Sequence, residues 1–271
     1  MPPPIERRKA GAAKIYVPKA KLERNMVEPQ LIREGRIAML SRRLFCGCLA
    51  AGSFVANAAH AQSVCELFTP ERQKSTSPEQ GITLLKDGNE RFVAGRSVNC
   101  DLNSMVKGTA ANQSPFAAVV GCIDSRVPPE LVFDQKIGDI FAARVAGNCV
   151  NTDIIGSLEY ATKVAGARAI VVLGHNNCGA IKSAVDGVEM GNITALLKNF
   201  KPALKTLTPA DGHRDSHNYP LVQKVAEANA RLTAQSLPKR SKIIADLVAS
   251  KQVVIASAMH DVTTGKVTWL S

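Results

Sequence analysis

Four continuous apolar runs mark the chain after residue 115. They cover residues 116–121, 140–145, 169–174 and 253–258. None of them alternates with polar residues, and unbroken runs of this length are typical of parallel strands that are buried on both faces. The last segment, residues 262–270, has the pattern of a turn followed by an edge strand. The sequence therefore predicts a sheet of mostly parallel strands.

A helix is expected before the first strand. Ser77 has the pattern of an N-cap, with Pro78 at the first helical position and Gln80 three residues after the cap. The helix is expected to run to about Val93. Residues 62–76, which precede it, look like a loose amino-terminal arm.

Helices are also expected between the strands. Asn151 caps one of them, and four apolar residues give it a buried stripe: Ile154, Ile155, Leu158 and Val164. Two more helices, over residues 221–237 and 239–250, are expected to be separated at Pro238. Alternating strands and helices predict an α/β fold, a mostly parallel open β-sheet flanked by helices, with an amino-terminal helical arm. In such sheets, sites form outside the carboxyl ends of the strands.

The first 61 residues carry an export pattern. The twin arginines Arg42 and Arg43 precede a short apolar stretch, residues 44–58, and residues 59–61 offer small side chains at the two positions that a signal peptidase reads. This order is typical of a twin-arginine signal peptide. A membrane anchor would need about 20 apolar residues. We therefore expect a periplasmic protein with no stable membrane anchor.

The same pattern divides the chain into three parts. Residues 39–61 form the signal peptide, with Met39 as the expected true start. Residues 1–38 are expected to be a non-native or disordered extension, and an amino-terminal extension of the signal is the alternative. Residues 62–271 form one domain, which is long enough for a sizeable core.

Charge argues against one class of function. The chain carries a net charge of +11, but residues 1–61 hold eleven of its 34 basic residues and four of its 23 acidic ones. The expected mature part therefore carries only +4. Aromatic residues make up 4% of the chain, and the sequence has no basic stripe with interleaved aromatics. No nucleic-acid partner is expected.

The chain has seven cysteines. Cys46 and Cys48 would leave with the signal peptide. Disulfides form in oxidising compartments, and Cys65 and Cys100 are the candidate pair. Cys149 is expected to be a free, partly buried thiol. The two remaining cysteines carry the candidate chemistry.

Two polar motifs follow predicted strands. Cys122 begins the motif Cys-Ile-Asp-Ser-Arg after the first strand, and His175 begins His-Asn-Asn-Cys, which ends at Cys178, after the third. Two thiolates and one imidazole suit Zn²⁺, and a catalytic site keeps three protein ligands and one open position. Asp124 has two alternative roles. It can pair with Arg126 and orient the attacking water, or it can bind the metal as a fourth ligand and close the site.

The same residue types allow other interpretations. With Asp124 as the fourth ligand, the site could be purely structural. A redox role for Cys122 is weaker, because no second cysteine lies nearby in the sequence. His213 and His217 lie in a polar stretch and are expected at the surface. His260 follows the fourth strand, and a local structural contact is favoured over a ligand role.

At these motifs the chain resembles the β-class carbonic anhydrases. The resemblance runs from about Ser77 to Leu270. Besides the two motifs, residues 138–148 resemble the segment that follows the second strand in that family, and residues 156–160 resemble its helix leading to the histidine strand. Together these segments argue against a purely structural zinc site.

The resemblance implies a set of site residues. One Zn²⁺ ion per chain would be bound by Cys122, His175 and Cys178, with Asp124 and Arg126 as the catalytic dyad. The substrate-binding residues would be Gln113, Phe141, Tyr160 and Gly179. Gln113 favours the open type of site, whereas Ala146 replaces a larger apolar residue that many members carry. Family members are homodimers or higher homo-oligomers, with pockets at the subunit interface.

The implied function is the reversible hydration of CO₂ to bicarbonate and a proton, which makes the protein a lyase. Zinc would lower the pKa of bound water and supply the hydroxide that attacks CO₂. One alternative is a carbon disulfide or carbonyl sulfide hydrolase on the same scaffold. Another is a non-catalytic, zinc-stabilised assembly protein.

Overall fold

The structure is a computed structural model, and it describes residues 65–270. The predicted signal peptide and the extension before it, with Cys46 and Cys48, lie outside the described residues. No described helix combines the length and the apolar character needed to cross a membrane.

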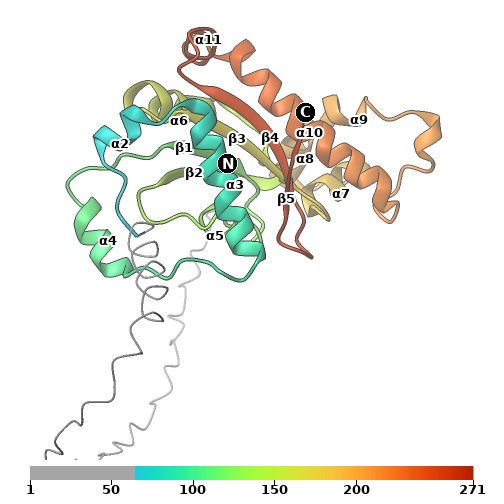
Figure 1. Cartoon of the computed structure of the whole chain (residues 1–271). Coiled ribbons are helices and arrows are strands. Elements are labelled where there is room, and N and C mark those ends of the chain that lie inside the picture. Colours follow the sequence, from blue (N-terminus) through green and yellow to red (C-terminus); the bar gives the residue numbers. More distant parts are fainter. Residues whose placement is uncertain (1–64, 271) are drawn as a thin grey trace, which may run out of the picture. The chain divides into compact units, whose positions relative to one another are not determined.

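Five strands form one sheet within residues 65–270 (Figure 1). Their order is β2-β1-β3-β4-β5, with bounds β1 (Ala117–Gly121), β2 (Ile140–Arg144), β3 (Ala169–His175), β4 (Val254–His260) and β5 (Val267–Leu270). The first four are parallel, and β5 pairs antiparallel with β4 at the edge. The four strands predicted from the apolar runs and the predicted edge strand are all confirmed.

Helices cover both faces of this sheet (Figure 1). Alternate residues of β1 point to opposite faces: Ala118 and Val120 belong to one core cluster, and Ala117 and Val119 to the other. The first cluster includes residues of α6 (Thr152–Glu159), the π-helical turn η2 (Tyr160–Val164), α7 (Gly179–Asp186), α8 (Gly191–Leu197), η3 (Lys198–Phe200), α9 (Lys201–Leu204), α10 (Tyr219–Arg240) and α11 (Lys242–Ala249). The second includes residues of α3 (Pro78–Val93) and α5 (Pro129–Val132). The remaining elements are α2 (Pro70–Ser75), α4 (Leu102–Thr109), η1 (Ala146–Asn148) and η4 (Pro209–Asp211).

The amino-terminal helix begins as its sequence predicts. The Ser77 hydroxyl accepts a hydrogen bond from the backbone N–H of Gln80, and the Gln80 side chain accepts one from the N–H of Ser77. This capping box satisfies two N–H groups that an open helix end would leave unpaired. Leu85 on α3 is fully buried against the sheet.

Three details of the helices differ from the sequence prediction. Helix α10 continues through Pro238 and ends at Arg240, so the break lies at Ser241, which caps α11. Residues 70–75 form α2, a short capped helix inside the segment expected to be a loose arm. Val164 is 70% exposed and is not part of a buried stripe.

The segment before α3 is tied to the domain. A disulfide joins Cys65 to Cys100, a pair that the sequence marked only as a candidate, and Cys149 is a free buried thiol, as expected. The Gln73 side chain donates to the carbonyl oxygens of Pro115 and Ala165, both at 2.7 Å. These bonds connect α2 to the loops that enter β1 and β3.

Candidate metal centre

Three candidate ligands come together at the carboxyl ends of two neighbouring strands. Cys122 follows β1, His175 is the last residue of β3, and Cys178 precedes α7. Their ligand atoms all lie within 4.8 Å of one another, and all three residues are buried. Strands β1 and β3 pair side by side, which explains how motifs far apart in the sequence meet.

The imidazole of His175 is oriented for metal binding. Its Nδ1 lies 2.8 Å from the carbonyl oxygen of Asn176, and because a carbonyl can only accept, Nδ1 carries the proton. Its Nε2 is buried and has no hydrogen-bond partner among residues 65–270. A lone pair on Nε2 is therefore directed into the site, the arrangement that metal-binding histidines use.

The two thiols influence each other strongly. The hydrogen bond between Cys178 and Cys122 lowers the pKa of Cys122 and raises the pKa of Cys178. Burial opposes the first shift and adds to the second. Metal binding at this pair would release thiol protons, because the thiolate is the form of cysteine that binds a metal.

Asp124 is paired with Arg126. Arg126 donates from Nε to Oδ1 at 2.9 Å and from Nη2 to Oδ2 at 2.8 Å, and its backbone N–H also bonds Oδ1. These bonds hold the pKa of the Asp124 carboxyl well below its usual range. Oδ2 lies 4.0 Å from Nε2 of His175, so the carboxylate borders the centre while it faces Arg126. This is the paired form of the two that the sequence allowed.

Two further residues, which the sequence did not single out, hold the Cys122 loop. Arg144 at the end of β2 donates to the carbonyl oxygens of Cys122 at 2.9 Å and of Asp124 at 2.6 Å. The backbone N–H of Gly147 donates to the Cys122 sulfur at 3.2 Å. Both lie in the segment 138–148, whose resemblance to the family was the available signal.

The His175 loop is held in a similar way. The side chain of Asn176 donates to Asp261 at 3.0 Å and accepts from the backbone N–H of Val262 at 2.9 Å. This pairing joins the turn after β3 to the turn after β4. It fixes the backbone carbonyl that bonds His175, and neither Asn176 nor Asp261 was predicted.

The remaining histidines lie outside the group of three. His213 and His217 are exposed, as expected. His260 is paired with His175 in the register of β3 and β4, is 3% exposed, and neither ring nitrogen has a hydrogen-bond partner in the described part of the chain. Its burial lowers the pKa of His260 to about 4.

The expected substrate-binding residues are dispersed in the single chain. Phe141 on β2 and Tyr160 in η2 meet edge to face, with ring centroids 6.5 Å apart, and line a cavity of about 590 Å³. Gly179 is exposed at the start of α7, beside Cys178. Gln113 is exposed before β1, whereas Cys122 follows it. A strand of five residues spans about 16 Å, so Gln113 lies far from the centre of its own chain.

The donor set and the fold define a class of protein. Two buried thiols next to a buried imidazole nitrogen fit Zn²⁺ better than the hard cations Mg²⁺ and Ca²⁺. Three donors leave a coordination position for water or substrate. The molecule is an α/β protein with a candidate catalytic Cys₂His metal centre at the carboxyl ends of its central strands.

Comparison with known proteins identifies the family. Residues 117–267 match the family model described as carbonic anhydrase. The chain is 34% identical over 198 residues to carbonic anhydrase 2 of Mycobacterium tuberculosis, covering 71% of this chain and 92% of that one. It is 32% identical over 188 residues to a carbonic anhydrase of Mycolicibacterium smegmatis, covering 69% and 90%. A tetrameric β-carbonic anhydrase of Sordaria macrospora shares the fold, with a TM-score of 0.54, 24% identity and coverage of 62% and 90%. The chain belongs to the β-carbonic anhydrase family and is an enzyme of that type.

Proposed function

We propose that the protein catalyses the reversible hydration of CO₂ to bicarbonate with one zinc ion held by Cys122, His175 and Cys178. The observation that carries the proposal is the geometry of the three buried ligand atoms next to the Asp124–Arg126 pair. Zinc bound there would act as a Lewis acid and acidify water, less strongly than in a site with neutral ligands because two thiolates offset its charge.

The residues around the centre have separate tasks. Asp124 is ionised at neutral pH, as an ordinary aspartate is, and Arg126 lowers its pKa further, so its carboxylate can only accept hydrogen bonds. We assign it the role of accepting one from the attacking water and orienting that water. Phe141 and Tyr160 would offer CO₂ an apolar surface, and the backbone N–H of Gly179 would be available to the product anion. The proton released would pass to buffer.

Gln113 points to an assembly of subunits. It lies at the end of β1 opposite to its own Cys122, so we propose that its amide hydrogen-bonds substrate in the site of a partner subunit. The cavity beside Phe141, where Tyr160 is 53% exposed, offers a place for a second copy to complete the pocket. The proposed active unit is therefore a homodimer or a higher homo-oligomer.

We also propose that the protein is exported to the periplasm. The disulfide between Cys65 and Cys100 supports this, because disulfides persist in oxidising compartments. Twin-arginine export carries folded proteins, so zinc could bind Cys122 and Cys178 before these thiols meet an oxidant. Replacing both Arg42 and Arg43 by lysine should retain the enzyme in the cytoplasm. Unchanged export would overturn the proposed route.

The test is stopped-flow CO₂ hydration, with zinc content determined on the same sample at neutral and mildly alkaline pH. The wild-type protein should turn over CO₂ at both values with one zinc per chain. Asp124→Asn should keep its zinc and lose roughly 10²–10⁴-fold in rate, the range of positioned acid–base groups. Asp246→Asn is the control, because it removes an exposed carboxylate that pairs with Lys242 on α11.

The other outcomes separate the alternatives. Activity at alkaline pH alone would mean that Asp124 closes the site at neutral pH. Loss of zinc from Asp124→Asn would make Asp124 a ligand. A zinc-loaded protein without CO₂ turnover would overturn the proposal and favour the sulfur-substrate hydrolase or the non-catalytic protein.

A further inference from the structure

The turn η1 brings a backbone amide to the metal centre. Gly147 and Asn148 both have positive φ angles, 69° and 45°, so the backbone turns sharply after β2. That conformation directs the N–H of Gly147 at the sulfur of Cys122, 3.2 Å away. A hydrogen bond of this kind withdraws some of the negative charge from the sulfur of a metal-binding thiolate.

The other side of Gly147 is held by a side chain from a distant helix. Asn229 lies on α10, is 4% exposed, and donates from Nδ2 to the carbonyl oxygen of Gly147 at 2.9 Å. Gly147 thus makes one bond to Cys122 through its N–H and one to Asn229 through its C=O. Its Cα faces Phe200, and a Cβ at this position would clash with that ring. The peptide groups of η1 are therefore fixed from three directions.

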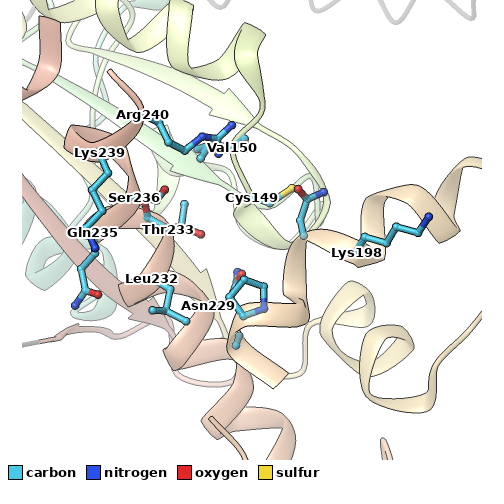
Figure 2. Close-up of a pocket in the computed structure, with 13 residues that line it drawn as sticks. Cys149, Val150, Lys198, Asn229, Leu232, Thr233, Gln235, Ser236, Lys239 and Arg240 are labelled. Carbon is cyan, nitrogen blue, oxygen red and sulfur yellow. Dashed lines mark hydrogen bonds between the residues drawn. The ribbon is translucent and has the colours of Figure 1, made fainter. Parts of the chain in front are cut away.

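The surroundings of Asn229 show that its contact is selective. Asn229 lines a cavity of about 460 Å³ that is bordered by α10, by η3 and α9, and by the segment that carries Cys149. Figure 2 shows residues that line this cavity. Thr233 lines the same cavity one turn further along α10, and it is also buried. Within residues 65–270, no hydrogen bond joins Thr233 to η1. The bond to the metal loop therefore belongs to position 229 and not to this face of α10 in general.

We infer that Asn229 is a positioning residue for the metal centre: it fixes the peptide of Gly147 so that its N–H hydrogen-bonds the metal-binding thiolate of Cys122. The inference rests on the proposed function, since it assigns Cys122 to the metal. Asn229 touches neither metal nor substrate in this role. It acts on the metal through one peptide group, and its effect is to tune how strongly Cys122 donates electrons.

If the role of Asn229 were purely structural, its replacement would have different effects. Asn229 could serve α10 and η1 as a buried hydrogen bond with no influence on the metal. Its loss would then lower the stability of the protein and leave the metal site unchanged. The two roles differ in the spectrum and the affinity of the bound metal, so these are the quantities to measure.

The test uses the full mature protein with Co²⁺ in place of Zn²⁺. In Asn229→Asp the shape is kept, but the donor is replaced by a carboxylate that repels the carbonyl of Gly147. We expect the thiolate-to-cobalt charge-transfer band to move to longer wavelength, because a thiolate without its hydrogen bond gives up electrons more easily. Zinc affinity, measured by chelator competition, should fall about 10–100-fold, the usual effect of losing a group that supports a ligand.

Thr233→Val is the matched control, because it removes a buried polar group from the same helix and the same cavity. Its band position and zinc affinity should equal those of the wild-type protein. Asn229→Ala, whose missing atoms leave space that opens to the cavity, repeats the test if Asn229→Asp does not fold. A band and an affinity that stay at the wild-type values in a folded Asn229 variant would overturn the inference.

The outcomes distinguish this inference from the proposed function. A wild-type protein that binds neither metal would overturn both. A wild-type protein that binds zinc and cobalt without hydrating CO₂ would overturn the proposed reaction alone, and the Asn229 variants would still decide the positioning role.

Discussion

His260 is a buried histidine whose ring has no hydrogen-bond partner among residues 65–270. It is 3% exposed. Burial outweighs the nearby carboxylates of Asp124 and Asp261, so the pKa falls to about 4. An unfolded histidine has a pKa of about 6.5. Between these values the unfolded chain binds a proton that the folded chain does not, so His260 makes the protein less stable as the pH falls.

Replacing His260 by phenylalanine should remove this dependence. The free energy of unfolding of wild-type protein should fall relative to that of His260→Phe as the pH is lowered from about 6.5 to about 4. The measurement is urea denaturation of both metal-free proteins, so that metal release at low pH does not contribute. His213→Gln, which removes an exposed imidazole, controls for the loss of a histidine. A difference between wild type and His260→Phe that is constant with pH would contradict the prediction.

At the scale of single residues, the sequence predicted the metal ligands but not the residues that position those ligands. Cys122, His175 and Cys178 were predicted from residue type and from their place after strands, and the structure brings them together. Asn229 could not be found in this way. It lies on α10, and only tertiary packing brings that helix next to the metal loop. An asparagine inside a helix is also not a distinctive sequence signal.

Turn η1 requires glycine at position 147. Gly147 has a φ of 69° and touches Phe200, so alanine there meets two obstacles. The left-handed conformation costs a non-glycine residue about 1–2 kcal/mol, and overpacking costs about 1–3 kcal/mol.

Gly147→Ala should therefore lower the free energy of unfolding by about 2–5 kcal/mol, the sum of these two terms. It should also weaken zinc binding, because the displaced N–H leaves the sulfur of Cys122. Chemical denaturation and chelator competition measure the two effects. Gly156→Ala is the control, since a Cβ there meets nothing within 4 Å and the residue is inside α6. Alanine is the better helix former, so this control should be neutral or up to about 1 kcal/mol more stable.

Element boundaries show where local signals compete with packing. The strands were predictable because their apolar runs, about six residues long, suit a buried parallel strand and are too short for a typical buried helix. The helix break predicted at Pro238 was wrong, because α10 continues to Arg240. A proline this close to the end of a helix removes only one hydrogen bond, and the rest of α10 stays packed on the sheet. Helix α2 was missed although Thr69 and the following proline repeat the cap pattern recognised at Ser77. Its shortness and its lack of buried residues hid it.

At the scale of the whole molecule, Gln113 makes a prediction about shared sites. In the proposed dimer, Gln113→Ala should lack the side-chain amide that binds substrate in both sites. Asp124→Asn should lack the Asp124 carboxylate in both sites. In a mixed dimer, one site combines an intact Asp124 with an intact Gln113 from the partner. Both parent proteins should therefore be impaired, and the mixture should recover.

The experiment is joint refolding of equal amounts of the two variants. Half of the dimers would be mixed and would carry one intact site of two, so about a quarter of wild-type CO₂ hydration should return. Separately refolded variants, combined afterwards, provide the control. Recovery that does not exceed this control would show that Gln113 serves its own subunit or none.

The placement of the ligands at the carboxyl ends of β1 and β3 has a consequence for the lifetime of the chain. Because the ligand atoms meet only when these strands pair, metal binds the folded chain in preference to the unfolded one. Metal at a hundred times its dissociation constant would add about 2.7 kcal/mol to the free energy of unfolding. The fraction of molecules open to proteases then falls about a hundredfold. The abundance of this enzyme would thus follow the supply of its metal, without any dedicated sensor.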